Sequence, residues 1–362
     1  MFDDVTDADT SPAGVIKRVE SLLMTFLDDR ANSLVDLGSD LEPVIQTARI
    51  CVLAGGKRLR PVFAYLAWQS AVAPGTDDTA VVNAVASLEL LHACALVHDD
   101  VMDASATRRG HPSAYAAFEQ LHHDSGFIGR RETFGRAAAI VLGDLLLSWA
   151  DRLFANSGLG PAAAQRARHV YDDMREQVMA GQYLDVLVQA RGGFSASDAL
   201  QVIEYKTSRY TVEGPLLFGA ATGGASEELT AALTAYGRPL GEAFQLRDDL
   251  LGVFGDPDQT GKPAGDDLRE GKRTLLVALA MHRAQPAQAA LLRERLGDPR
   301  LDDAALTSLR HLIVDTGAVD DIEARIASRT AEARAALAST SIRADVRDVL
   351  DGLAVAAAER QT

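Results

Sequence analysis

The sequence VNAVASLELLHACALVHDDVMD (residues 82–103) decides the fold class of this 362-residue chain. Apolar residues occupy every face of the helix that it would form, which is typical of a helix buried in the centre of a large helical protein. The stretch ends in an acidic cluster that contains Asp99, Asp100 and Asp103. Aspartate is unfavourable inside helices and is almost never fully buried unless it is paired. The cluster therefore needs a compensating positive charge.

The spacing of this first acidic cluster points to a metal. Asp99 and Asp103 are four residues apart and share one helix face, where two like charges destabilise a bare helix. Carboxylate oxygens are hard ligands that suit Mg²⁺. One or two Mg²⁺ ions would therefore stabilise this arrangement. The alternative is a solvated acidic helix face, which the apolar residues around the cluster make less attractive.

A second acidic cluster, Asp248 and Asp249, lies in another apolar stretch, EAFQLRDDLLGVFGD (residues 242–256). Gly252 stands where this cluster would carry a third carboxylate, so we expect it to hold fewer metals than the first. Asp266 and Asp267, in the charged segment that follows, would add support through water. The two clusters together predict a protein that uses Mg²⁺ to hold a phosphorylated ligand.

Composition favours one all-α domain. Hydrophobic residues make up 47% of the chain and aromatic residues only 6%, and alanine and leucine dominate, which favours helices over strands. No linker rich in proline, glycine or serine interrupts the middle of the chain. We therefore predict a disordered tail at residues 1–12 and one helical domain at residues 13–362.

Helix signals place the main elements along the chain. Ser11 and Pro12 are typical of an N-cap followed by the first helical residue. Further helices are predicted over residues 162–190, 197–221 and 227–254, with amphipathic helices in the last 60 residues. Two segments read as loops, LHHDSGFIGRRETFG (residues 121–135) and GDPDQTGKPAGDDLREGK (residues 255–272).

Charge and cysteine usage exclude several classes of protein. The formal net charge of −15 argues against binding to nucleic acid or to an anionic membrane surface. Cys51 and Cys94 lie in apolar helical stretches and indicate core thiols of a cytoplasmic protein, not a disulfide. The N-terminal residues show no signal peptide. The apolar stretch AAAIVLGDLLLSWA (residues 137–150) is broken by Asp144 and is too short to span a membrane.

Basic residues form small groups that suit phosphate groups. Lys57, Arg58 and Arg60 lie at a glycine-flanked helix start, where free N–H groups and the helix dipole favour anions. Arginine binds phosphate oxygens in a bidentate manner. The other candidate anion-binding residues are Arg108, Arg109, Lys206, Lys262 and Lys272. Each group alone would usually be a surface charge cluster, but their joint occurrence with the two acidic clusters favours an anionic ligand.

Two polar residues face the acidic clusters, and other motifs offer weaker alternatives. His92 lies two helical turns before Asp99, and Gln245 lies three residues before Asp248; a satisfied core histidine is the competing interpretation of His92. The two ExxH patterns that end at His92 and His122 resemble a di-iron bundle, although the second runs into a predicted loop. The segment GDPDQTGK resembles a phosphate-binding loop but has the wrong spacing and Pro263 in place of Ser or Thr.

Taken together, these residues resemble the trans-isoprenyl diphosphate synthases of the polyprenyl synthetase family over about residues 40–280. The motifs that carry the resemblance, in the family's order, are GGKRLRP (55–61), HACALVHDDVMD (92–103), RRG (108–110), KT (206–207), FQLRDD (244–249) and GK (261–262). The resemblance implies an all-α homodimer of the isoprenoid synthase fold, a single-domain helical bundle around a central cavity, that uses Mg²⁺, three ions per active site. It also implies a transferase that joins an allylic diphosphate to isopentenyl diphosphate and releases pyrophosphate.

The resemblance assigns roles to individual residues. The implied metal ligands are Asp99, Asp103 and Asp248, supported by Asp100 and Asp249. Residues that would contact the allylic diphosphate are Arg108, Lys206 and Lys262. Those that would bind isopentenyl diphosphate are Lys57, Arg60, His92 and Arg109, beside Arg58. Thr207 and Gln245 would border the reacting carbons, and Lys272 would close over the site.

Product length follows from residues one turn before Asp99. In the family, aromatic residues at this point stop growth at fifteen carbons, whereas this chain has Cys94 and Ala95. We therefore expect geranylgeranyl diphosphate (C20), with farnesyl or longer products as alternatives. A class I terpene cyclase would carry a different second metal motif, and a non-catalytic subunit of a heteromeric synthase would lack one acidic cluster.

Overall fold

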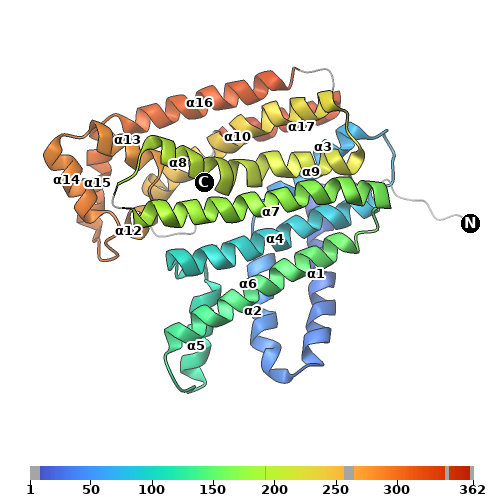
Figure 1. Ribbon diagram of the computed structural model, residues 1–362, viewed down its shortest axis with the longest axis horizontal. Coiled ribbons are helices and arrows are strands. Elements are labelled where there is room, and N and C mark those ends of the chain that lie inside the picture. The colour runs from blue at the N-terminus through green and yellow to red at the C-terminus, as the bar shows by residue number, and fades with distance from the viewer. Residues whose placement is uncertain (1–8, 192, 257–264, 339–341, 359–362) are drawn as a thin grey trace, which may run out of the picture. The chain divides into compact units, whose positions relative to one another are not determined.

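The computed structural model describes residues 9–191, 193–256, 265–338 and 342–358 of the chain. In these residues nearly all regular structure is helical, which confirms the all-α prediction. The elements, of which Figure 1 labels the α-helices, begin with α1 (Pro12–Val35), η1 (Ser39–Leu41), α2 (Glu42–Leu53), α3 (Leu59–Ala71), α4 (Thr79–Asp103), β1 (Thr107–Arg108), β2 (His111–Pro112), α5 (Ala114–Asp124), α6 (Arg131–Ala155) and α7 (Pro161–Ala190). They continue with α8 (Ala196–Val202), η2 (Ile203–Glu213), α9 (Gly214–Gly223), α10 (Glu227–Phe254), α12 (Asp266–Glu270), α13 (Leu275–Arg283), α14 (Pro286–Arg295), α15 (Asp303–Asp315), α16 (Ala318–Ala336) and α17 (Ala344–Ala358).

The chain divides into two compact units. The first comprises Met1–Met102, His111–Arg168 and Phe218–Ala225, and the second comprises Asp103–Gly110, His169–Leu217 and Ser226–Thr362. The prediction of a single domain over residues 13–362 stays a prediction. Most of the predicted disordered tail, residues 1–8, lies outside the described residues, and α1 begins at Pro12.

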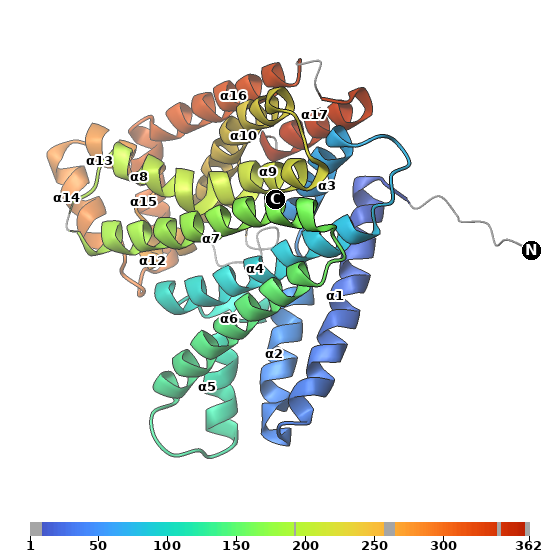
Figure 2. The ribbon, with the colours of Figure 1, turned by 45° about the vertical axis from the view of Figure 1, so that its right-hand side comes forward.

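Helix pairs build the first unit around α4. The N-cap of α1 is Ser11, whose hydroxyl accepts a hydrogen bond from the Gly14 N–H at 3.2 Å, so the predicted helix start is confirmed. Figure 2 shows α1 beside α2 and α5 beside α6, two contacting helix pairs joined by short loops. Residues on all faces of α4 are buried, from Val81 to Asp100, as its sequence predicts.

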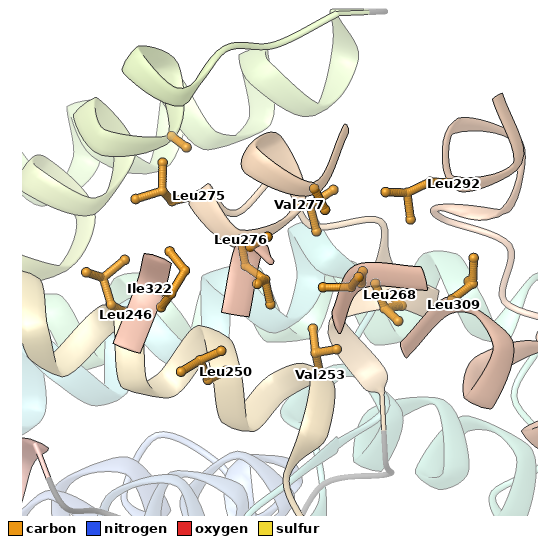
Figure 3. Packing of buried hydrophobic residues seen from close by; sticks show 14 of the residues in the cluster. Leu246, Leu250, Val253, Leu268, Leu275, Leu276, Val277, Leu292, Leu309 and Ile322 are labelled. Carbon is orange, nitrogen blue, oxygen red and sulfur yellow. The ribbon is translucent and has the colours of Figure 1, made fainter. Parts of the chain in front are cut away.

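The second unit has its own hydrophobic core. Helix α10 packs against α16 and η2 and supplies Leu246, Leu250 and Val253 to the buried cluster in Figure 3. Leu268 of α12 and Ile322 of α16 are fully buried in the same cluster. This packing anchors both ends of the segment between α10 and α13. It therefore sets the position of the second acidic cluster, which occupies the last two turns of α10.

The prediction of a loop over residues 121–135 was wrong at both ends. Helix α5 continues to Asp124, and α6 begins at Arg131. The reason is the buried side chain of His122, whose ring contacts Phe127 and Phe134 at centroid distances of 5.8 and 5.4 Å. His122 Nε2 also forms a hydrogen bond with the Ile128 carbonyl at 3.2 Å. A polar run with this much aromatic packing extends the helices and shortens the loop.

The predicted loop 255–272 also contains structure that the sequence did not suggest. Residues 257–264 lie outside the described residues, but α12 follows directly at Asp266–Glu270. A two-stranded hairpin, β1 and β2, follows α4, and its turn holds Arg109 at a φ of 53°. Within the described residues, α4 alone is long and apolar enough to cross a membrane, and 72% of its most apolar window is buried inside the protein. That degree of burial is typical of the core helix of a protein. The stretch 137–150 does not meet the length and hydropathy needed to cross a membrane, as its sequence predicts.

Candidate functional site

The second acidic cluster contains one buried carboxylate in the second unit. Asp249 is 5% exposed, and its Oδ1 accepts a hydrogen bond from Gln245 Nε2 at 2.6 Å. Burial raises the pKa of Asp249 to about 8, and the negative charges of Asp267 and Asp248 act in the same direction. The Gln245 hydrogen bond and the charge of Lys272 oppose this shift of the pKa. The site therefore favours additional positive charge.

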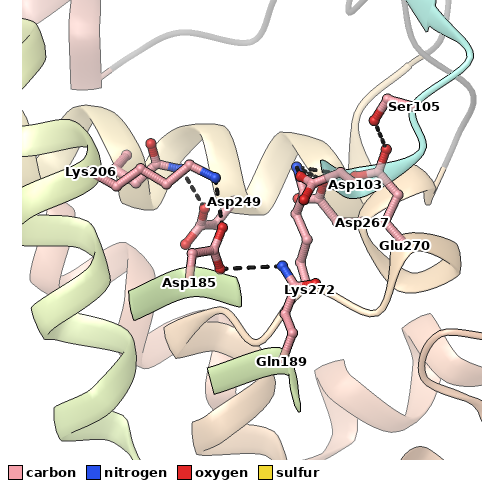
Figure 4. A network of polar contacts seen from close by, with 10 residues as sticks. Asp103, Ser105, Asp185, Gln189, Lys206, Asp249, Asp267, Glu270 and Lys272 are labelled. Atoms are coloured by element: carbon pink, nitrogen blue, oxygen red, sulfur yellow. Dashed lines mark hydrogen bonds and ion pairs between the residues drawn. The ribbon is translucent and has the colours of Figure 1, made fainter. Parts of the chain in front are cut away.

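Lys272 lies among three carboxylates in this unit, as Figure 4 shows. Its Nζ is 3.1 Å from Glu270 Oε2, 3.5 Å from Asp267 Oδ1 and 3.7 Å from Asp103 Oδ2. The Ser105 hydroxyl also donates a hydrogen bond to Glu270. The side chains of Asp103 and Glu270 are only 2% and 9% exposed. The ammonium group of Lys272 thus lies close to three buried carboxylates. One comes from the last residue of α4 and two come from α12.

Two close helix contacts position Lys206 and Thr207. Both residues lie in η2, a π-helical segment, and such segments often mark functional sites. A side chain on Gly181 of α7 would overlap the backbone of Lys206, and one on Gly241 of α10 would overlap Ser208. Glycine at both points lets α7 and α10 pack against the backbone of η2. Lys206 Nζ consequently reaches Asp185 Oδ2, one turn beyond Gly181, at 2.6 Å.

The first unit holds Lys57, Arg58 and Arg60 of the predicted isopentenyl diphosphate site, whereas Arg109 lies in the second unit. Lys57 is exposed and Arg60 is half-buried, whereas the side chain of Arg58 is only 2% exposed. Arg58 Nη1 donates to Glu89 Oε2 at 2.7 Å, and Arg58 Nε lies 3.3 Å from Glu20 Oε1. This geometry favours a structural role for Arg58, and its predicted contact with substrate stays a prediction.

The same contacts weaken the di-iron alternative. Glu89 is paired with Arg58, and His122 is enclosed by aromatic rings and bonded to a backbone carbonyl. Neither residue is arranged as an iron ligand. Among the residues that the structure describes, no group of three or more His, Cys, Asp or Glu side chains gathers closely enough to hold a metal ion by itself.

The structure distributes the predicted site residues over both units. In the first unit lie Lys57, Arg58, Arg60, His92, Asp99, Asp100. In the second lie Asp103, Arg108, Arg109, Lys206, Thr207, Gln245, Asp248, Asp249, Lys272. Figure 4 draws Asp103, Lys206, Asp249 and Lys272 of the second unit in separate contacts: Lys272 with Asp103, Lys206 with Asp185, and Asp249 with Gln245. Lys262 lies outside the described residues.

Sequence reasoning missed Asp185 and Glu270. Asp185 is 9% exposed and binds both Lys206 and Gln189, the latter at 3.3 Å. The sequence could have identified Asp185, because this aspartate interrupts the apolar run YLDVLV (residues 183–188) and lies one helical turn before Gln189. Glu270 had no such signal, because it lies in a charged segment where an acidic residue is unremarkable. Its role becomes visible only through its contacts with Ser105 and Lys272.

The donor set suits Mg²⁺. Asp103, Asp249 and Asp267 offer carboxylate oxygens, the ligands that this ion prefers. The three carboxylates around Lys272 exceed its single positive charge, and burial disfavours the ionised form of Asp249. A divalent cation would offset this excess of negative charge. The residues therefore fit the metal, although in the described residues they do not form a complete centre.

A helical protein with two acidic clusters, each containing a buried aspartate and accompanied by basic residues, is suited to holding a phosphorylated ligand through cations. The sequence profile of the Polyprenyl synthetase family matches residues 42–313. The chain belongs to the polyprenyl synthetase family. It has the all-α isoprenoid synthase fold of that family, and it is a prenyltransferase by this membership.

Individual relatives support this assignment over most of the chain. It is 34% identical to the geranylfarnesyl diphosphate synthase of Aeropyrum pernix, over 76% of this chain and 80% of the relative. It is 35% identical to the octaprenyl diphosphate synthase of Escherichia coli, over 72% and 73%. A crystal structure of the geranylgeranyl pyrophosphate synthase from Corynebacterium glutamicum, complexed with isoprenyl diphosphate and magnesium, superposes with a TM-score of 0.92 at 40% identity, covering 98% of this chain and 99% of that one.

Proposed function

We propose that this protein condenses isopentenyl diphosphate with an allylic diphosphate, in the presence of Mg²⁺, to give geranylgeranyl diphosphate. The observation that carries the proposal is the retention of both acidic clusters, Asp99–Asp103 and Asp248–Asp249, with carboxylates and Lys272 gathered around the second. Membership of the family supports the reaction class. A non-catalytic subunit would have no need to retain both clusters.

Charge determines where each substrate would bind. Mg²⁺, when bound by Asp99, Asp103 and Asp248, would offset the negative charge of the allylic diphosphate and of the pyrophosphate that leaves. Arg108, Lys206 and Lys262 would contact the same diphosphate through charge-assisted hydrogen bonds. A second basic group would bind isopentenyl diphosphate, and its members would be Lys57, Arg58, Arg60, His92 and Arg109.

The remaining demand on the protein is to exclude water. Cleavage of the allylic C–O bond leaves a carbocation that water would capture. The side chains around this carbocation must therefore be unreactive and must exclude water. Apolar residues of α4, such as Leu91, Cys94 and Val97, are buried before the first acidic cluster. Thr207 and Gln245 would border the reacting carbons. The double bond of isopentenyl diphosphate would attack the carbocation and form the new C–C bond. The released pyrophosphate would accept the proton that the resulting cation loses, so no side-chain base is needed.

A direct assay tests this proposal. The purified protein is incubated with Mg²⁺, labelled isopentenyl diphosphate and the C5, C10 or C15 allylic diphosphate in turn, and products are separated by chromatography. We expect prenyl transfer with one or more of these primers and C20 as the main product. Cyclic hydrocarbons from an allylic diphosphate alone would instead indicate a terpene cyclase. No product with any primer would contradict the proposed reaction.

Product length is the finer part of the proposal. The relatives named above make products of different lengths, and the C20 assignment rests on the small residues Cys94 and Ala95 one turn before Asp99. Replacing Ala95 by phenylalanine adds a bulky ring at this point of α4. We expect the Ala95→Phe variant to make shorter products, with C15 dominant, at unchanged dependence on Mg²⁺.

The matched control for this variant is Ala290→Phe, at an exposed position of α14. It adds the same ring at a position that has no predicted role in the site, and we expect it to keep the wild-type product. If Ala95→Phe leaves the product length unchanged, another residue limits chain growth.

The cytoplasmic location and the homodimer are further proposals. The free thiols of Cys51 and Cys94 support the first, and the usual oligomeric state of the family supports the second.

A further inference from the structure

The second acidic cluster lacks a carboxylate on α10, and a neighbouring element occupies the missing position. Gly252 follows Asp248 by one helical turn, so a side chain there would face the same way as Asp248. A Cβ atom built on Gly252 would overlap Oδ2 of Asp267 and would lie 3.0 Å from its Oδ1. The carboxylate of Asp267 therefore fills the space that any side chain at residue 252 would need.

The position of Asp267 is fixed by the packing of α12. This five-residue helix lies between Gly265 and Gly271, both with positive φ. Leu268 is fully buried in the core of the second unit, and its carbonyl accepts a hydrogen bond from Gly297 N at 2.9 Å. The Asp267 side chain therefore projects toward α10 from a firmly anchored backbone. A larger residue at position 252 would therefore force the Asp267 side chain to rotate, because the backbone of α12 is anchored.

The electrostatic surroundings of Asp267 match those of the acidic cluster. Asp267 is 8% exposed, and its Oδ1 lies 3.5 Å from Lys272 Nζ. Its charge and that of Asp248 both act on Asp249. A carboxylate is costly in such a place unless positive charge is close. Lys272 supplies part of that charge and shares it with Asp103 and Glu270.

We propose that Asp267 supplies, from α12, the third carboxylate that residue 252 of α10 lacks. It acts as a positioning residue that orients the metal-bound diphosphate at the second cluster, and glycine at residue 252 makes room for it. The inference rests on the proposed function for the presence of a metal and a diphosphate there. It differs from a purely structural role, in which Asp267 would only hold Lys272.

The first experiment removes the charge of Asp267 and tests its electrostatic role in the inference. The Asp267→Asn variant keeps the shape of the side chain, and inorganic pyrophosphate binding is measured by calorimetry over a range of Mg²⁺ concentrations. We expect the Mg²⁺ concentration for half-maximal binding to rise about 10–100-fold, the usual effect of losing an outer partner of a metal site. The control, Asp173→Asn at an exposed position of α7, should bind as the wild type does.

The second experiment moves the carboxylate from residue 267 to residue 252 and tests whether its position in space is what matters. In the Gly252→Asp variant two carboxylates compete for one volume, so its midpoint of thermal unfolding should fall below that of the wild type. The double variant Gly252→Asp/Asp267→Ala carries one carboxylate on α10 instead of α12. We expect it to recover thermal stability and to bind pyrophosphate at lower Mg²⁺ concentrations than Asp267→Ala does. A structural role for Asp267 alone predicts no such recovery of Mg²⁺ dependence.

Two results would overturn the inference while leaving the reaction intact. One is an active wild-type enzyme whose Asp267→Asn variant binds pyrophosphate at the wild-type Mg²⁺ concentration. The other is a Gly252→Asp variant that is as stable as the wild type, with effects that simply add in the double variant. Failure of the proposed function looks different, because then the wild-type protein itself forms no prenyl product.

Discussion

The Asp248→Asn variant is expected to lose prenyl transfer almost completely, with turnover about 10²–10³-fold below that of the wild type. The substitution keeps the size of the side chain but removes the negative charge that would hold Mg²⁺ at the second cluster. Losing a single preorganised group that stabilises developing charge commonly costs this much. Turnover is measured by release of pyrophosphate at saturating substrates over a range of Mg²⁺ concentrations.

The same assay separates a lost site from a lost fold. Asp173→Asn removes one exposed carboxylate from α7 and should keep full activity. The midpoint of thermal unfolding of Asp248→Asn should stay near that of the wild type, because Asp248 is only half-buried. Activity within threefold of the wild type, judged on the scale of about 0.6 kcal/mol per factor of three, would show that Asp248 is not a metal ligand.

Much of this fold could be predicted because helix signals are local. The N-cap at Ser11, the all-round apolar pattern of α4 and the extent of α10 follow from residues a few positions apart. The loop over residues 121–135 could not be predicted in the same way. Its helical ends depend on the packing of His122 against Phe134, a contact between two helices that local patterns do not encode.

The candidate site was predictable to the extent that charge in an apolar sequence needs a partner. That rule identified the aspartates, whereas Lys272 was a candidate because it ends the charged segment 255–272. The structure places Lys272 3.7 Å from Asp103, and its charge also acts on Asp249. The rule did not identify which basic residue pairs with which acid. Arg58 looked like a ligand of phosphate because it follows two glycines, yet its side chain turns inward to Glu89. Only three-dimensional packing decides between these outcomes.

Glu89→Gln is expected to be the most destabilising of the charge-removing substitutions in the first unit. The side chains of Glu89 and Arg58 are both 2% exposed and lie 2.7 Å apart. Replacing the carboxylate by an amide leaves the buried guanidinium with only the more exposed carboxylate of Glu20 as a charge partner. Breaking such a pair usually costs about 3–5 kcal/mol. We expect a loss of this size in the free energy of unfolding, measured by urea denaturation.

A surface pair provides the control for this measurement. Glu332 is paired with Arg329 at 2.6 Å, but their side chains are 55% and 33% exposed. Because exposed pairs contribute little, Glu332→Gln should lower the free energy of unfolding by less than about 1 kcal/mol. Equal losses in the two variants would mean that the burial of the Arg58 pair has no energetic consequence.

The double variant Arg58→Met/Glu89→Met then decides what Arg58 does. Replacing both members of a buried ion pair by apolar residues of similar size is often neutral, so most of the lost stability should return. If Arg58 is structural, the double variant should keep the wild-type KM for isopentenyl diphosphate. If Arg58 instead binds that diphosphate, stability returns while the KM rises, because the guanidinium is absent from a correctly folded site. The two roles thus separate in one protein, in which stability reports the pair and KM reports the ligand.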